Sequence, residues 1–422
     1  MKKLLCLAVC ALSATGLMSC KNAKFKPALD KNTECSIKVV GDYSNFEALE
    51  DEFARFNAYY PNVNLIYEKI DDYVNSLPNV LERADKPNIF FSYAAWMSGD
   101  AKYEKIVSHM ENLSDPALKI NLDCLREGLV NHDKDGNVVM VPIFSRTYGT
   151  LVNNNIFEKE GLKTPNTWDE LLSVCDTLKE KGYVSPMMGY SKKTSNCLMY
   201  TIAYPAFVAA LANDPEALAK ANNLNPAAGE YMRTALEKVH ALVSRGAINL
   251  TECDKIEDNY TKVILRFFEG DVPMMICGGD TVSGTKKRET ESQAFKNNPF
   301  KYSYIPIPLT DKGGYFIDSP SIQFSVNKTC ENLDMTNEFM RFLVRNKELN
   351  NMASLKRLVT PTKDLTFDSV FAPFAKVSKD RTFSPEALGV KDPLSVQIRN
   401  ASFKVAKDQI SIEDAIAGYG SL

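Results

Sequence analysis

The stretch from Val141 to Tyr190 constrains the fold more than any other part of this chain. Residues 147–153 alternate toward apolar side chains, as a strand entering a core does. Further on, Thr167 and Glu170 form a capping box, which satisfies the free N–H groups at the start of a helix. Gly182 ends that helix. The pattern predicts strand, short helix, long helix and strand, and the buried face of the long helix is Leu171, Val174, Cys175 and Leu178.

The same stretch carries a specific order of residues. Pro142 precedes a strand that ends in Asn153, and then come FEKEGL at 157–162 and TWDEL at 167–171. This order resembles the hinge and second-lobe entry of extracellular solute-binding proteins that serve ABC importers. The most similar group is the sugar binders that include maltose-binding protein. The resemblance implies a class of binder and leaves the ligand open.

A chain of 422 residues is long enough for two domains, because single hydrophobic cores stop growing near about 250–300 residues. The resemblance implies an α/β fold of type II, a two-lobe periplasmic-binding-protein-like clamp in which each lobe is a mainly parallel sheet flanked by helices. The expected boundaries are 36–143 plus 279–318 for lobe 1, 148–274 plus 323–422 for lobe 2, and hinge crossings near 142–149, 274–279 and 318–323.

A second motif lies at residues 268–280, with the sequence FEGDVPMMICGGD. It is similar to a family segment in which Phe-x-x-Gly leads into an apolar strand, a glycine and a ligand-contacting residue. Many sugar binders carry Trp directly after that glycine, whereas this chain has Asp280. The departure weakens the inference to sugars stacked on an indole ring.

The N-terminus has the features of an export signal. Lys2 and Lys3 precede an apolar run at 4–12 that is too short to span a membrane. Leu17-Met18-Ser19-Cys20 resembles a bacterial lipoprotein box, which implies a signal peptide at 1–19 and lipidation of Cys20. The alternative is an ordinary signal peptide with a chance cysteine. Residues 20–35 are polar and aperiodic, and we expect them to be a tether.

Composition excludes several classes of partner and cofactor. A net charge of −3 and the absence of a basic block argue against nucleic acid binding. The chain has three histidines and no cysteine or histidine pair at ligand spacing, so we expect no metal and no cofactor. Of ten cysteines, seven remain after Cys6, Cys10 and Cys20 are set aside. Their scatter indicates no disulfide framework and leaves one or two pairings open.

The resemblance also implies where a ligand is contacted, at loops beyond the ends of strands in both lobes. Polar and aromatic side chains on these loops are our candidates: Asp42, Tyr43, Trp96, Arg146, Tyr148, Tyr190, Asn196, Asp280 and Asp318. For each, a solvated loop or hinge packing is the alternative, and for Trp96 it is the core. The aspartates suit sugar hydroxyls or a cation, whereas Arg146 suits a carboxylate or phosphate. A polyol, a polyamine and an anionic sugar all stay open.

We therefore expect a monomeric, lipid-anchored binder on the cell membrane, facing the periplasm or the cell exterior. It would capture a small polar solute, a carbohydrate in the first place, and pass it to ABC permease subunits. The alternative is the same clamp acting as a sensing or interaction lipoprotein. For an enzyme we find no Gly-x-Ser-x-Gly, His-Glu-x-x-His or Walker motif. Only paired carboxylates in a cleft stay compatible with catalysis.

Overall fold

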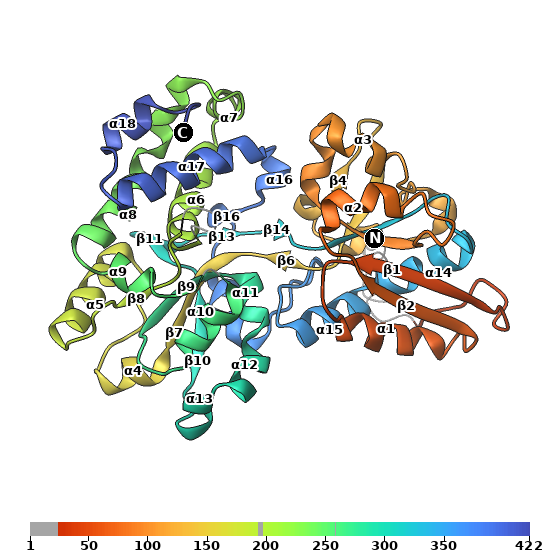
Figure 1. Cartoon of the computed structure of the whole chain (residues 1–422), viewed down its shortest axis with the longest axis horizontal. Helices are drawn as coiled ribbons and strands as arrows, with labels where there is room; N and C mark the ends of the chain where they lie inside the picture. The colour runs from red at the N-terminus through yellow and green to blue at the C-terminus, as the bar shows by residue number, and fades with distance from the viewer. Residues whose placement is uncertain (1–23, 193–196, 258) are drawn as a thin grey trace, which may run out of the picture.

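Two lobes, each with its own hydrophobic core, make up the protein (Figure 1). A computed structural model describes residues 24–192, 197–257 and 259–422. The predicted two-lobe clamp of type II is confirmed. Within the described residues, no helix combines the length and the apolar character needed to cross a bilayer.

Lobe 1 is built on a six-stranded sheet with helices on both faces. Helices α2 and α3 lie on one side, and α1, α14 and α15 pack together on the other (Figure 1). The strand order is β2 (Val63–Lys69), β1 (Cys35–Gly41), β3 (Ile89–Ser92), β15 (Gln323–Val326), β5 (Val138–Pro142) and β4 (Asn131–His132). The helices are α1 (Glu47–Asn57), α2 (Tyr73–Val80), α3 (Ala101–Val107), α14 (Leu333–Leu343) and α15 (Asn346–Lys356).

Lobe 2 has a smaller sheet and more helices. Its strand order is β10 (Tyr302–Ile305), β7 (Tyr148–Asn153), β9 (Met274–Gly278) and β8 (Met187–Met188). The helices are α4 (Asn154–Lys159), α5 (Trp168–Glu180), α6 (Cys197–Leu211), α7 (Pro215–Asn222), α8 (Arg233–Ser244), α9 (Leu250–Cys253), α10 (Tyr260–Phe267), α11 (Gly279–Ser283), α12 (Thr285–Glu291), α13 (Gln293–Asn297), α16 (Pro385–Leu388), α17 (Asp392–Ala406) and α18 (Ile412–Ala417).

Three two-stranded pairings complete the described strands. They are β11 (Pro308–Thr310) with β12 (Gly313–Gly314), β13 (Phe316–Ile317) with β16 (Thr382–Phe383), and β14 (Ser319–Pro320) with β6 (Ser145–Arg146).

The αβ unit at the start of lobe 2 forms as its sequence predicts. Thr167 Oγ1 accepts a hydrogen bond from the Glu170 N–H, and the Glu170 carboxylate accepts one from the Asn166 N–H at 2.7 Å. The capping box therefore starts α5, although its return bond goes to residue 166. Gly182 has a φ of +92°, which a residue with a Cβ adopts only with strain. The predicted apolar face of α5 is fully buried.

The sheets are mixed, so the expectation of mainly parallel sheets is wrong. In lobe 1, β1 runs parallel to β2 and β3, whereas β15 is antiparallel to β3 and β5. In lobe 2, β7 is antiparallel to β9 and β10. The physical reason is that β15 enters its sheet directly from the other lobe. It has no βαβ crossover, and only that connection requires neighbouring strands to be parallel.

Three parts of the expected domain division are also wrong. The core of lobe 1 draws on residues from Phe25 to Phe144 and from Ile322 to Leu358. The core of lobe 2 draws on Leu151 to Ile317 and on Val359 to Tyr419. Residues 279–318 therefore belong to lobe 2, and 323–358 to lobe 1. The segment 274–279 is no crossing, since β9 stays between β7 and β8; the third crossing lies at 358–359.

The three crossings are joined by backbone pairing at the hinge (Figure 1). Strand β6 pairs with β14 in antiparallel fashion, and Ser145 forms an isolated bridge to Val359. Next to this pairing, the Asp318 carboxylate accepts two hydrogen bonds from Arg126, both 2.7 Å long, and one from the Ser145 hydroxyl. Arg126 also donates to the carbonyls of Thr360 and Thr362. One guanidinium thus ties lobe 1 to two of the crossings.

Asp318→Asn should lower the free energy of unfolding by about 3 kcal/mol, because removing one partner of a buried pair leaves the other charge uncompensated. Asp318 is 6% exposed. Urea denaturation followed by circular dichroism measures the loss. The exposed pair of Arg233 and Glu230 is the control, and Glu230→Gln should cost much less, because solvent screens an exposed ion pair. An equal, small effect of both substitutions would contradict a structural role for Asp318.

Candidate functional site

Lobe 1 presents two loops to the other lobe, one after β1 and one after β3. The Tyr93 hydroxyl donates a hydrogen bond to Asp42 Oδ2 at 2.9 Å, which links the two loops. The ring of Tyr43 packs edge-on against Phe46 and Phe91, with centroids 5.4 and 5.5 Å apart. Both loops are therefore held from beneath by the aromatic core of lobe 1.

Trp96 belongs to that core. It is 3% exposed and packs edge-on against Tyr93, with ring centroids 5.3 Å apart. Of the two interpretations open for this residue, the structure therefore places it in the core. Its contact with Tyr93 makes it a support for the loop. Tyr93, which sequence reasoning missed, is the aromatic residue of this loop that also bonds to a candidate, Asp42.

Lobe 2 contributes three tyrosines that pack on one another. Tyr148 begins β7 and lies edge-on to Tyr200 and Tyr204 of α6, at 5.4 and 5.7 Å between centroids. Tyr200 and Tyr204 are stacked at 4.8 Å. Helix α6 is apolar around most of its circumference, as a helix buried on all sides must be. We call Tyr148, Tyr200 and Tyr204 the tyrosine cluster.

Arg146 lies beside this cluster on β6, at the hinge. Among the described residues, its Nε has no hydrogen-bond partner although that atom is buried. The pKa of Arg146 is raised, first by Tyr148 and then by Asp280 and Glu386, against the opposing effect of burial. Its positive charge also acts on Tyr93 in lobe 1. Arg146 is thus a charged donor between the two lobes with capacity left for a further acceptor.

Asp280 faces lobe 1 from the start of α11. It is exposed, and it accepts a hydrogen bond from the Ser321 hydroxyl at 2.9 Å. Burial raises the pKa of Tyr43 well above its ordinary value, and the charge of Asp280 is the next largest cause. The carboxylate therefore lies near the β1 loop. Asp42, Tyr43 and Tyr93 on one side, and Arg146, Asp280 and the tyrosine cluster on the other, define what we call the interlobe site.

Glu386 is a further member of this site that sequence reasoning missed. It lies on α16, is half-buried, and has a buried Oε2 without a hydrogen-bond partner among the described residues. Burial raises its pKa to about 7, against the attraction of Arg146. No local signal marks it, because α16 is one short helix that returns to the hinge 240 residues after Arg146 in the chain.

The remaining candidates lie elsewhere or outside the described residues. The Asp318 carboxylate already accepts hydrogen bonds from Arg126 and Ser145 at the hinge, which makes it a structural residue. Tyr190 is half-buried just beyond the end of β8 and packs against the core of lobe 2. Asn196 lies outside the described residues.

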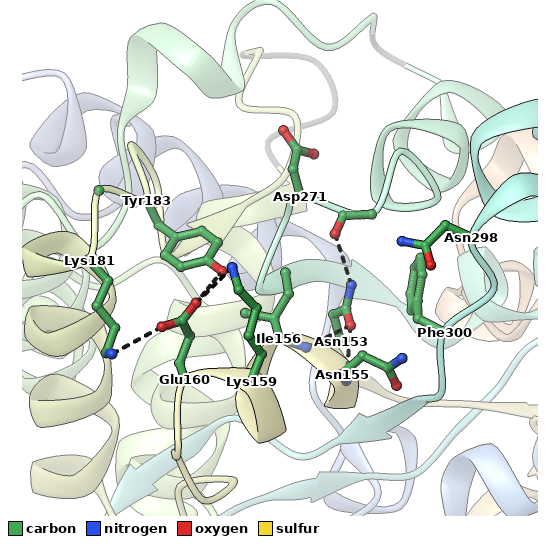
Figure 2. A pocket seen from close by; sticks show the side chains of 12 residues that line it. Asn153, Asn155, Ile156, Lys159, Glu160, Lys181, Tyr183, Asp271, Asn298 and Phe300 are labelled. Carbon is green, nitrogen blue, oxygen red and sulfur yellow. Dashed lines mark hydrogen bonds and ion pairs between the residues drawn. The ribbon is translucent and has the colours of Figure 1, made fainter.

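A separate hollow of about 450 Å³ lies on lobe 2, at the end of β7 that is remote from the hinge (Figure 2). Its charged groups satisfy one another. Lys159 and Lys181 pair with Glu160 at 3.1 and 3.0 Å, and the Tyr183 hydroxyl donates to the same carboxylate. The hydrogen bond from Lys181 is the largest cause that lowers the pKa of Glu160 to about 2. Because its lysines are already paired, this hollow has less free charge to offer a ligand than the hinge region.

The described residues contain neither a metal-binding cluster nor a disulfide. Searched over these residues, groups of three His, Cys, Asp or Glu side chains able to hold a metal ion are absent. The seven cysteines from Cys35 to Cys330 form no disulfide with one another. The groups that the interlobe site presents are hydroxyl, carboxylate, guanidinium and aromatic side chains.

Two lobes, three crossings and facing aromatic and charged loops define a ligand-binding clamp. Comparison with known families agrees with this geometry. The family described as bacterial extracellular solute-binding protein matches residues 41–349, and the chain belongs to this family. Its members bind small solutes outside the cytoplasm, in the periplasm or at the cell exterior, and work with ABC transporter permeases.

Individual relatives are distant. An uncharacterized ABC transporter extracellular-binding protein of Pyrococcus horikoshii is 22% identical over 151 residues, which are 34% of this chain and 34% of the relative. The match thus spans about a third of the relative's length.

Solved structures share the fold across nearly the whole chain. MsmE, a binding protein of Bacillus subtilis in an open conformation, has a TM-score of 0.66 at 18% identity, covering 92% of this chain and 96% of that one. RafE in complex with raffinose has a TM-score of 0.66 at 16% identity, and the match covers 91% of this chain and 98% of RafE. The GacH receptor of Streptomyces glaucescens was solved unliganded and with acarbose. Its TM-score is 0.64 at 15% identity, and the match covers 92% of this chain and 97% of the receptor.

The displaced pKa of Glu386 makes stability depend on pH. The folded chain holds this proton up to about pH 7, whereas the unfolded chain releases it near 4.5. Stability from this group is therefore complete below about pH 4.5 and is lost as pH rises through 7. Glu386→Gln should remove that loss. The free energy of unfolding of the variant, compared with that of the parent, should therefore be about 1–3 kcal/mol more favourable at pH 8 than at pH 4.

Urea denaturation of both proteins across this pH range measures the difference. Burial also raises the pKa of Glu52 to about 7, but Glu52 is present in both proteins and cancels. Glu413→Gln, on the exposed face of α18, is the control and should keep the parent pH profile. Parallel profiles for Glu386→Gln and the parent would show that Glu386 ionises normally.

Proposed function

We propose that this chain is a lipid-anchored solute-binding protein that captures a small polar solute, in the first place a carbohydrate, in the interlobe site and delivers it to an ABC importer. The observation that carries the proposal is Arg146, whose buried Nε has no hydrogen-bond partner among the described residues and whose charge acts on Tyr148 of lobe 2 and on Tyr93 of lobe 1. The solved relatives whose names print raffinose or acarbose support a sugar as the first class to test.

The chemistry of the lining suits a hydroxyl-rich ligand. Tyrosine rings offer flat apolar area for the C–H face of a sugar, and their hydroxyls donate and accept hydrogen bonds. Asp42 and Asp280 accept from ligand hydroxyls, and Arg146 donates to ring or hydroxyl oxygens. A polyamine is disfavoured, because its cations would lie against the unpartnered guanidinium. The ligand would thus be held by charge-assisted hydrogen bonds without any group poised to break a covalent bond.

Closure would follow from contacts with both lobes. A ligand shifts the balance between open and closed forms only through a difference in affinity for the two, and about 5.5 kcal/mol moves it from 1:99 to 99:1. A solute bound to Arg146 and the tyrosine cluster gains further bonds from Asp42 and Tyr93 when lobe 1 approaches. The closed, loaded clamp is then the form that an importer would receive.

Anchoring would place this clamp at the membrane. Cys20, within the lipoprotein-like Leu-Met-Ser-Cys segment, would carry the lipid after removal of residues 1–19. Two or more acyl chains would supply enough buried CH₂ groups for stable attachment, whereas one chain alone binds only marginally.

Thermal-shift measurements on the soluble chain that starts at Lys21 test the binding proposal. Raffinose, stachyose and acarbose are the probes, and spermidine is the cationic comparison. A ligand at 100 times its dissociation constant adds about 2.7 kcal/mol of stability. We expect Asp280→Asn to weaken binding of the stabilising sugar about tenfold or more, which corresponds to the loss of about 1.4 kcal/mol from one charge-assisted hydrogen bond.

The matched control is Asp271→Asn. Asp271 is also an exposed aspartate of lobe 2, but it pairs with Arg266 at the remote hollow and should leave affinity unchanged. Equal loss of binding in both variants would remove the interlobe site from consideration. Recovery of a chemically altered sugar would contradict the binding proposal and indicate an enzyme.

A further inference from the structure

Residues 25–29, which we call the N-terminal strap, are docked on lobe 1. The sequence predicts a polar tether over residues 20–35, and for this part the prediction is wrong. Phe25 is 6% exposed and belongs to the core of lobe 1, and Leu29 packs against the same core. A single aromatic residue in a stretch without helical or strand periodicity does not indicate docking. The polar, aperiodic sequence therefore predicted a tether.

Phe25 is held by rings and cations together. Its ring lies edge-on to Tyr59 and to Phe342, with centroids 5.2 and 5.3 Å apart. The guanidinium of Arg341 lies over the ring at 4.5 Å, and that of Arg345 at 5.7 Å. These partners come from the C-terminal ends of α1 and α14 and the loops that follow them. The strap therefore ties together two helix ends on the outer side of lobe 1.

Backbone hydrogen bonds fix the strap in register. The Ala28 N–H donates to Glu338 Oε1 at 2.8 Å and to the Tyr60 hydroxyl at 3.1 Å, and the Leu29 N–H donates to the same hydroxyl at 3.2 Å. Glu338 is buried and paired with Arg341, which donates in turn to the Lys26 carbonyl. The bonds are specific, because each backbone group meets a side chain that the lobe holds rigidly.

We propose that the strap fixes which part of the protein faces the membrane: the ends of α1 and α14 in lobe 1 lie against the bilayer, and lobe 2 is the lobe that swings. This inference rests on the proposed lipid at Cys20. Only four residues separate Cys20 from Phe25 in the sequence, so the chain between them spans at most about 18 Å. A docked Phe25 therefore leaves lobe 1 no freedom to move far from its lipid.

Charge at the strap suits a bilayer with anionic lipids. Lys24 and Lys26 are exposed beside Phe25. Arg341 and Arg345 lie over its ring, but their charges are paired with Glu338 and Glu348, so the two lysines are the basic groups left for the headgroups. Clusters of basic residues next to a lipid anchor are attracted to anionic headgroups within a Debye length. The end of lobe 2 that carries α18 lies far from α1 and α14 along the long axis of the molecule (Figure 1) and would stay away from the bilayer.

Docking of the strap is tested first without a membrane. In the soluble chain that starts at Lys21, the amide hydrogens of Ala28 and Leu29 should exchange at least about tenfold more slowly than in an unstructured peptide. Phe25→Ala should restore fast exchange there without changing exchange in lobe 2. Fast exchange in the parent chain would overturn the proposal at its root.

Orientation is tested with the lipidated full-length protein in phosphatidylglycerol-containing vesicles that carry a nitroxide headgroup quencher. A fluorophore is placed at Asn62→Cys, an exposed position whose side chain reaches the Asn32 carbonyl, or at Glu413→Cys on α18. The half-buried Cys35, Cys197 and Cys330 are replaced by Ser in both proteins. We expect loss of fluorescence at position 62 and little loss at 413.

Two variants decide the interpretation. Twenty Gly and Ser residues inserted between Ala23 and Lys24 keep the strap docked but lengthen the free chain, and should abolish the quenching at position 62. Phe25→Ala should reduce the difference between the two positions. Equal quenching at 62 and 413 in the parent would overturn the orientation. Failure of the parent to bind vesicles, with Cys20→Ser behaving identically, would instead refute the lipid anchor.

Discussion

The ion pair between Arg126 and Asp318 is the interaction on which the two-lobe arrangement depends. It joins lobe 1 to the second crossing, and the same guanidinium reaches the carbonyls that follow the third crossing. Antiparallel pairing of β6 with β14 adds backbone bonds at the same place. The hinge is therefore stiff along the strands and can bend across them, which is the motion that opens and shuts a clamp.

The same hinge positions two residues of the proposed binding site. Arg146 lies on β6, directly opposite Ser319 in the pairing, and Tyr148 follows it at the start of β7. Two residues apart on extended chain, both side chains point to the same side. Residues from the ends of β1 and β3 face them from lobe 1. The extended segment that leaves lobe 1 and enters lobe 2, β6 with the start of β7, thus both pairs at the hinge and carries two of the proposed ligand contacts.

Local signals predicted local structure well. The capping box at Thr167 and the glycine at 182 mark α5 because each acts within one turn of the helix. Local signals do not show which sheet a strand joins. All residues of β15 are buried, and a short buried strand of this kind fits the sheet of either lobe. The assignment depends on pairing with β3 and β5, which lie about two hundred residues away. The sequence named Asp318 as a ligand contact and missed both its role at the hinge and the place of Glu386 for the same reason, because their partners are distant in sequence.

The central claim is that a small solute draws the two lobes together, and small-angle X-ray scattering tests it most directly. The soluble chain that starts at Lys21 is measured alone and then saturated with the sugar that stabilises it. The account predicts a smaller radius of gyration with the sugar bound. Saturating binding at an unchanged radius would contradict a clamp that closes on its ligand.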